Sequence, residues 1–102
     1  MSYRLSRKAE EDLIQIFIHG MEEFGVAQAE NYHAAFERQF RRLSENPRMG
    51  RERNEIKPPV RVLPLRSHII IYLIDGEEEV FVVRIRHMRE DWEGQERPPG
   101  AE

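Results

Sequence analysis

Histidine is the first residue type in this 102-residue sequence that could do chemistry, as a metal ligand or as an acid or base. The four histidines are His19, His33, His68 and His87. Their spacing fits no metal-binding motif such as HExxH and the sequence has no cysteine, so we predict neither a metal site nor a cofactor. His87 stands beside Arg84, Arg86 and Arg89, where a base or a recognition group could act, and an ordinary surface histidine is the alternative.

Arginine is the second candidate, because a guanidinium group binds phosphate or carboxylate through two parallel hydrogen bonds. Five arginines would cluster if the last three predicted strands pair as neighbours: Arg61, Arg66, Arg84, Arg86 and Arg89. A cluster of this kind would bind a partner. The alternative is pairing within the chain, with Glu77, Glu78, Glu79, Glu90 or Asp91. The sequence contains no glycine-rich phosphate loop and no GxSxG motif, so we expect a protein that binds macromolecules.

Charge is unevenly distributed along the chain. Nine basic residues against three glutamates give the segment from Arg38 to Arg66 a charge of +6, while the net charge is −3. The remainder therefore carries −9. The negative total argues against direct nucleic-acid binding, and the segregation indicates an acidic partner or an internally paired surface.

Two amphipathic helices must position these residues. Ser6 can cap a helix that ends at Gly25, and a second helix runs from Val26 until Pro47 and Gly50 stop it. The core stripe predicted for the first helix consists of Ala9, Leu13, Ile16, Phe17 and Phe24, widened by Ile14, Ile18 and Met21. The stripe predicted for the second helix consists of Ala29, Tyr32, Phe36, Phe40 and Leu43. The wide stripe on the first helix indicates that something covers its second face.

Strands are predicted before and after the helical hairpin in the sequence. Tyr3 to Leu5 is a short extended segment, and three β-branched runs follow a polar loop at residues 47–59. Asp75 and Gly76 predict a tight antiparallel hairpin between the last two runs. Alternation places Phe81, Val83 and Ile85 toward the helices and Val80, Val82, Arg84 and Arg86 away from them.

The predicted fold is therefore α+β, an N-terminal helical hairpin packed on a small antiparallel sheet with one N-terminal and three C-terminal strands. We predict one domain at residues 1–92 and a flexible polar tail at 93–102. The charged N-terminus, the lack of cysteine and the lack of an apolar run long enough for a membrane span predict a cytoplasmic protein.

Four segments carry a resemblance to a known family: YRLSRKAEEDL, FERQFRRLSENPRMGR, VRVLPLRSHIIIYLID and VVRIRHMREDW. In this order they contain NPxxG after the second helix, the pattern R-x-L-P-x-x-x-H-x-I-x-Y from Arg61 to Tyr72, and RxxH near the end. From Tyr3 to Trp92 the sequence resembles the ParE toxins of the RelE/ParE superfamily. The chain continues past the usual closing segment of that family with residues 93–102.

The resemblance implies a toxin of a bacterial type II toxin–antitoxin pair, held inactive in a hetero-oligomer with a ParD-like antitoxin. Released, such a toxin binds DNA gyrase and arrests growth. The implied antitoxin site combines an apolar groove with cationic sheet residues: Ile14, Ile18, Met21, Arg61, Arg84 and Arg86. The implied target site lies in the closing segment at His87, Met88, Arg89 and Trp92, although Trp92 could equally cover the core.

RelE-like enzymes are the alternative from the same superfamily, since they share the fold and cut ribosome-bound mRNA. Arg61, Arg84 and His87 could serve as the catalytic groups of that reaction. However, no tyrosine follows Tyr72, and the RHMREDW ending favours the gyrase-directed branch. A third possibility is a member that binds its antitoxin and has lost toxicity.

Overall fold

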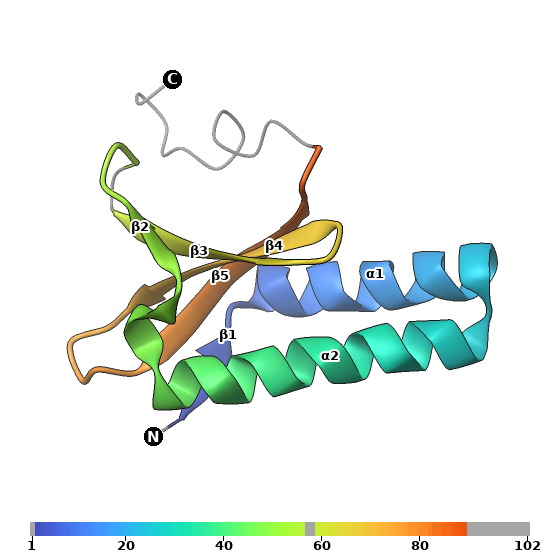
Figure 1. Ribbon diagram of the computed structural model, residues 1–102, viewed down its shortest axis with the longest axis horizontal. Helices are drawn as coiled ribbons and strands as arrows, with labels where there is room; N and C mark the ends of the chain where they lie inside the picture. Colours follow the sequence, from blue (N-terminus) through green and yellow to red (C-terminus); the bar gives the residue numbers. More distant parts are fainter. Residues whose placement is uncertain (1, 57–58, 90–102) are drawn as a thin grey trace.

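The computed structural model describes residues 2–56 and 59–89 and contains a helical hairpin packed on one face of a five-stranded sheet (Figure 1). The predicted α+β class and the hairpin are confirmed. The elements in chain order are β1 (Tyr3–Leu5), α1 (Arg7–Phe24), α2 (Val26–Glu45), the 3-10 helix η1 (Pro47–Met49), β2 (Arg51–Arg53), β3 (Val60–Leu65), β4 (His68–Ile74) and β5 (Val80–His87). Neither helix has an apolar stretch of the length and hydropathy that a bilayer span requires.

The strand order is β1-β5-β4-β3-β2, so β4 is central, as its run of apolar residues predicts. Two features differ from the prediction. β1 pairs with β5 in parallel, which makes the sheet mixed rather than antiparallel. β2 lies inside the segment predicted as a loop and pairs antiparallel with β3. Its sequence, Arg-Glu-Arg, has no apolar alternation, because this edge strand is held by backbone pairing and buries little.

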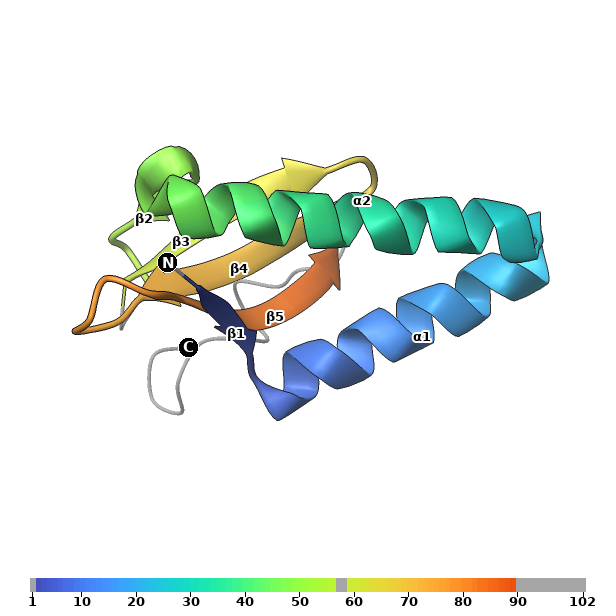
Figure 2. The same cartoon turned by 90° about the horizontal axis from the view of Figure 1, so that it is seen from below.

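The helix α2 lies across the sheet (Figure 2), and the main core lies between them. The helix α1 contributes the buried Ala9 and the partly buried Leu13 and Ile16. The buried side chains of this cluster are Ala9, Phe36, Phe40, Leu43, Ile70, Tyr72, Val80, Val82 and Ile85. A second, smaller cluster covers the opposite face of the sheet and consists of Ile56, Val60, Ile69 and Ile71. Both faces of β4 are therefore buried, as predicted.

A β-bulge in β5 corrects the predicted alternation of this strand. Tyr72 pairs with Val82, whereas the preceding Ile71 pairs with Arg84, so Val83 is the extra residue. The bulge reverses which side chains face the helices. Val80 and Val82 lie in the helix-side core, contrary to prediction, while Ile85 does so as predicted.

The N-terminal end of α1 satisfies the backbone groups that the bulge leaves outside the sheet. Ser6 Oγ accepts a hydrogen bond from the Ala9 amide at 2.9 Å, which confirms the predicted cap, and donates to the Val83 carbonyl at 2.7 Å. Asp12 Oδ2 accepts the Ile85 amide at 2.9 Å. These contacts join the start of α1 to the outer edge of β5.

The exposed part of α1 differs from the prediction at one residue. Phe24 was expected in the core stripe, but 71% of it is exposed, because the hairpin extends past the end of the sheet and nothing in the described chain covers its tip. Ile14 and Ile18 are 56% and 38% exposed and lie one helical turn apart. Met21 is half-buried.

Candidate functional site

Arg84 is joined to α1 by a bidentate ion pair. Its Nε donates to Asp12 Oδ2 at 2.8 Å and its Nη2 donates to Asp12 Oδ1 at 3.0 Å. The two side chains are only 17% and 15% exposed, so the pair is largely withdrawn from water. Because Asp12 also accepts the Ile85 amide, this carboxylate fixes both the Arg84 side chain and the edge of β5. The structure therefore places Arg84 in an internal pair, with a partner that the sequence analysis did not predict.

Arg61 belongs to a hydrogen-bonded network that links the motifs NPxxG and R-x-L-P-x-x-x-H-x-I-x-Y. Its Nη1 donates to the Gly50 carbonyl at 2.8 Å. The buried Tyr72 hydroxyl donates to the Pro47 carbonyl at 2.6 Å and accepts the Gly50 amide at 2.8 Å. A Cβ on Gly50 would lie 2.6 Å from the Tyr72 oxygen and 2.9 Å from the Val62 carbonyl, so only glycine fits. Burial raises the pKa of Tyr72, although the Gly50 amide and nearby Arg61 act in the opposite direction.

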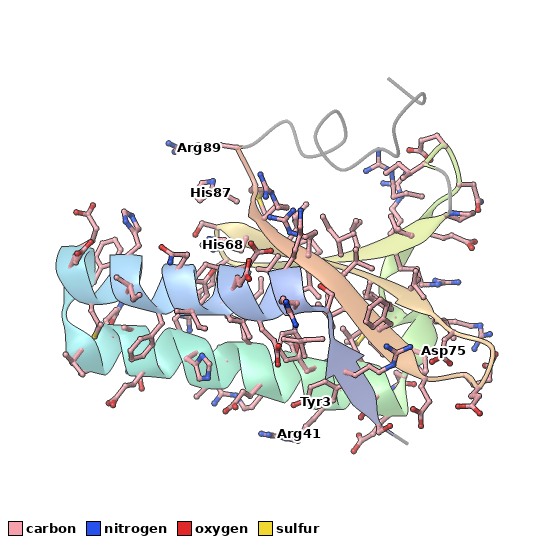
Figure 3. The ribbon with its side chains drawn as sticks, turned by 180° about the vertical axis from the view of Figure 1, so that it is seen from behind. Tyr3, Arg41, His68, Asp75, His87 and Arg89 are labelled. Carbon is pink, nitrogen blue, oxygen red and sulfur yellow. The ribbon has the colours of Figure 1, made fainter. Side chains whose placement is uncertain are left out.

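The five arginines predicted to cluster occupy separate parts of the sheet. Arg61 lies near the start of β3, whereas Arg66 follows its end, a separation of about 17 Å at strand spacing. Arg84 and Arg86 pair with Ile71 and Ile69, whose cluster lies on the face opposite the helices, so the register places both residues on the predicted face. The Arg84 guanidinium nevertheless binds Asp12 of α1. Arg89 follows β5 and is exposed (Figure 3). The prediction of a single patch was therefore wrong, because it assumed that arginines on paired strands share one face and one end.

The three residues of the ribonuclease alternative do not converge. The Arg84 guanidinium is bound to Asp12 of α1, while His87 contacts His68, with ring centroids 5.1 Å apart. Arg61 pairs with Tyr72 and His87 pairs with His68, four residues apart on β4, which separates them by about 13 Å along the strand. No site within hydrogen-bond reach of all three groups is formed.

The surface of α1 carries an apolar strip that we define as Ile14, Ile18 and Met21. Beside it, a shallow groove runs between the two helices on their outer side. Its acidic residues are Glu10, Glu30 and Glu37, and its apolar lining consists of Leu5, Leu13, Ile14, Phe17 and Ala34. The predicted apolar surface on α1 is present, and an acidic groove that the sequence did not reveal adjoins it at Ile14.

The end of β5 carries the described part of the predicted target site. Met88 is 47% exposed, and its amide donates to the Ser67 carbonyl at 2.8 Å, which ties the segment to the β3–β4 turn. The Arg89 amide donates to His87 Nδ1 at 3.1 Å. Trp92, Glu90, Asp91 and the predicted tail at 93–102 lie outside the described residues.

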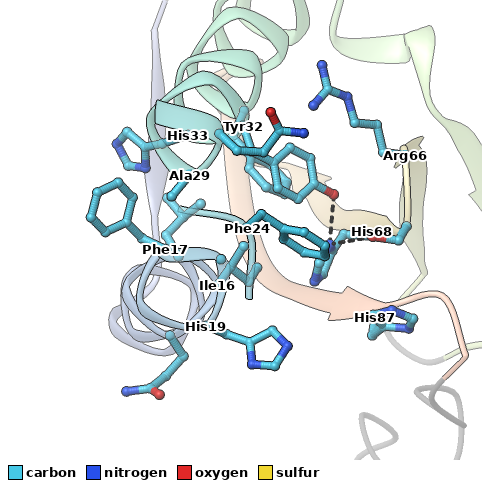
Figure 4. Close-up of a pocket in the computed structure, with 16 residues that line it drawn as sticks. Ile16, Phe17, His19, Phe24, Ala29, Tyr32, His33, Arg66, His68 and His87 are labelled. Carbon is cyan, nitrogen blue, oxygen red and sulfur yellow. Dashed lines mark hydrogen bonds between the residues drawn. The ribbon is translucent and has the colours of Figure 1, made fainter. Parts of the chain in front are cut away.

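A pocket of about 450 Å³ lies where the hairpin extends past the sheet (Figure 4). Phe17 and Phe24 of α1 and Ala29 of α2 form its apolar walls, and the β3–β4 turn and His87 close one end. Tyr32 stands at that end, where its hydroxyl lies 2.7 Å from His68 Nδ1 and donates to the Leu65 carbonyl at 3.0 Å. Burial raises the pKa of Tyr32.

Metal binding receives no support from the geometry of the described residues, because no three histidine or acidic side chains among them are placed to hold an ion. Sequence reasoning missed Asp12, which is the residue that fixes Arg84. A signal was present: Asp12 follows Ala9 by three residues and precedes Ile16 by four, so a carboxylate stands on the sheet-facing stripe and requires a partner there.

Comparison with known proteins adds a family and relatives. Residues 3–92 match the family model described as "ParE toxin of type II toxin-antitoxin system, parDE". Toxin ParE1 of Mycobacterium tuberculosis is 38% identical over 89 residues, which are 87% of this chain and 91% of the relative. Toxin ParE3 of Caulobacter vibrioides is 32% identical over 80 residues, 78% of this chain and 79% of the relative.

A solved structure has the same fold. The chain is similar, with a TM-score of 0.75 and 26% identity, to one described as "Chromosomal ParDE TA system from P. aeruginosa". The similarity covers 87% of this chain and 97% of that one, so both helices and the sheet are shared.

Proposed function

The chain belongs to the ParE toxin family of type II toxin–antitoxin systems, and on this basis we propose that it arrests growth by binding DNA gyrase and is neutralised by a ParD-like antitoxin. The neutralised form is a cytoplasmic toxin–antitoxin hetero-oligomer. The toxin acts by binding its target, without a catalytic step of its own.

The geometry of the two basic side chains is the observation that favours inhibition by binding over mRNA cleavage. Arg84 is held by Asp12 and Arg61 by the Gly50 carbonyl, and neither lies with His87 at one site. A ribonuclease needs cations at the scissile phosphate close to an acid or base. Here both guanidinium groups stabilise the fold.

The proposed antitoxin surface is the apolar strip on α1. Ile14 and Ile18 are exposed and adjacent, and fully covering one such side chain contributes roughly 1.5 to 3 kcal/mol. Arg84 and Arg86 lie on β5, which α1 contacts, whereas Arg61 lies two strands further along the sheet. Acidic antitoxin residues would therefore meet Arg86 and the outer side of the Asp12–Arg84 pair.

The test of target is expression in bacteria without the antitoxin, followed by a DNA-damage reporter and by transcript integrity. We expect a damage response with intact mRNA, and inhibition of purified gyrase in a supercoiling assay. Rapid mRNA cleavage without DNA damage would replace the proposal with the RelE-like alternative. Absence of both responses would leave an antitoxin-binding protein without toxicity.

The test of the antitoxin surface compares two substitutions that each add a carboxylate to an exposed aliphatic position. Ile18→Glu alters the apolar strip, whereas Val26→Glu alters the start of α2, where Val26 is 55% exposed. We expect Ile18→Glu to weaken binding of the ParD-like antitoxin by roughly tenfold or more, since a buried charge is costly. Val26→Glu should change the affinity less than about twofold. Equal losses of affinity in the two variants would exclude the apolar strip as the antitoxin surface.

The proposed target surface is the closing segment with His87, Met88, Arg89 and Trp92. A Met88→Ala, Arg89→Gln double variant should lose gyrase inhibition and keep its antitoxin affinity, because both side chains are exposed just after β5 and neither belongs to the apolar strip on α1. If the double variant still inhibited gyrase, the closing segment would not be the surface that contacts the target.

A further inference from the structure

The pocket at the end of the sheet has features that neither the antitoxin nor the gyrase proposal uses. We propose that it is a binding site for a small aromatic carboxylate, with the ring between the helices and the carboxylate beside the β3–β4 turn. The proposal does not depend on the identity of the antitoxin or of the target.

The size and walls of the pocket fit an aromatic ring. Its volume of about 450 Å³ lies in the range of small-molecule sites, roughly 300 to 1,000 Å³. Phe17 and Phe24 provide aromatic walls, and Ala29 lies close to Gly20 of the other helix, where the Cβ atom of Ala29 would be 3.5 Å from a Cβ on that glycine. That separation is ordinary van der Waals contact, so the helices approach closely here and these two small residues add little side-chain volume to the pocket lining.

The polar end of the pocket favours an anion. Its charged or titratable residues are all basic or phenolic, and none of the described lining residues carries a carboxylate. Arg66 lies at the turn, with its guanidinium carbon 5.2 Å from the centroid of the Tyr32 ring, and it forms no ion pair with a described residue. Ser67 and His68 follow Arg66 in the chain and also line the pocket as hydrogen-bonding groups. A carboxylate beside Arg66 would accept charge-assisted hydrogen bonds.

This end of the pocket is preorganised by contacts within the protein. Because the Tyr32 hydroxyl donates to the Leu65 carbonyl, it accepts from His68 Nδ1. His68 also contacts His87 and Phe36 through its ring. Side chains fixed in this way lose little freedom when a ligand binds.

The opposite side of the hairpin has the opposite charge. The outer groove is lined by Glu10, Glu30 and Glu37, while the pocket shares only Leu13, Phe17 and His33 with it. A ligand that bound through apolar contacts alone would occupy both sites, whereas an aromatic carboxylate should bind in the pocket and be repelled by the acidic groove. This contrast provides an internal control.

The experiment uses the full chain and three probes with the same ring and linker: 3-phenylpropionate, 3-phenylpropanol and 3-phenylpropylamine. Binding is followed by amide chemical shifts in heteronuclear NMR spectra. We expect 3-phenylpropionate to bind with a Kd on the order of 1 mM, with the largest shifts at Ala29, Ser67 and His68. The amine should bind at least about tenfold more weakly. Equal or tighter binding of the amine, shifts confined to the outer groove, or no saturable shift with any probe would overturn the proposal.

Two pairs of variants separate charge from apolar contact. Arg66→Gln should weaken 3-phenylpropionate about fivefold and leave 3-phenylpropanol unchanged, while Arg38→Gln, an exposed change on α2 outside the pocket, should alter neither. Phe24→Ala should weaken all probes that bind, whereas Val26→Ala should not. An unchanged acid-to-alcohol ratio in Arg66→Gln would refute the charge argument.

Discussion

Tyr72→Phe removes a single oxygen atom from the centre of the network that joins η1, β2 and β3. In the protein this hydroxyl donates to the Pro47 carbonyl at 2.6 Å and accepts the Gly50 amide at 2.8 Å. Tyr72 and Gly50 are both buried. The substitution therefore leaves the Gly50 amide without its partner in a place that water does not reach, while the ring stays in the core.

The magnitude follows from these two bonds. A buried amide without a partner costs roughly 1 to 3 kcal/mol, and loss of the bond to Pro47 adds about 0.5 to 1.5 kcal/mol. We expect a loss of about 2 to 3 kcal/mol in the free energy of unfolding. For a domain of this size that corresponds to a fall in Tm of roughly 10 to 20 °C.

The assay is urea and thermal unfolding followed by circular dichroism, with Tyr3→Phe as the matched control. Tyr3 contacts Phe40 through its ring, at 5.4 Å between centroids, and its hydroxyl makes no hydrogen bond to a described residue. The control should change the free energy of unfolding by less than about 0.5 kcal/mol. A loss in Tyr72→Phe no larger than in Tyr3→Phe would refute the structural role that we assign to this hydroxyl.

Two further predictions test other contacts, and a third tests the pH dependence of the Tyr72 contribution. Asp12→Asn should lower the free energy of unfolding by about 2 kcal/mol, because Arg84 loses a charged partner, and a double-mutant cycle with Arg84→Met should show coupling. Ser6→Ala should cost about 1 kcal/mol, since both the helix cap and the bond to Val83 are lost; unchanged urea unfolding would contradict this. Burial raises the pKa of Tyr72 in the folded state, so the stability gained from its neutral hydroxyl is complete below the unfolded pKa of about 10 and is lost as pH rises further. The free energy of unfolding should therefore fall less steeply at alkaline pH in Tyr72→Phe.

Much of the fold could be predicted from local pattern. The apolar period and the Ser6 and Gly25 signals located both helices within a residue or two, because caps and breakers act on the nearest turn. The alternating and continuous apolar runs located β3, β4 and β5. By contrast, β2 gave no signal, since an edge strand of three charged residues is held by backbone bonds that any residue can make.

The candidate site was predicted less completely. Exposed aliphatic residues on α1 could be identified, because a second apolar stripe has no role inside a small domain. The fate of Arg84 could not, because Asp12 lies 72 positions away and the pair forms only when α1 reaches the edge of β5. The pocket at the end of the sheet could not be predicted either, since it forms between both helices, the β3–β4 turn and the ends of β4 and β5.

The amino-acid sequence alone determined the two helices, the three long strands and the residues by which the chain resembles its family. Those features follow from interactions between near neighbours and from the burial of apolar side chains with a regular period. Only the tertiary structure decided which arginines form ion pairs within the chain, at which residue the side-chain alternation of β5 is reversed, and which apolar surfaces remain exposed to solvent. Each of these depends on a contact between distant segments, and one extra residue at Val83 is enough to reverse which side chains of the strand face the helices.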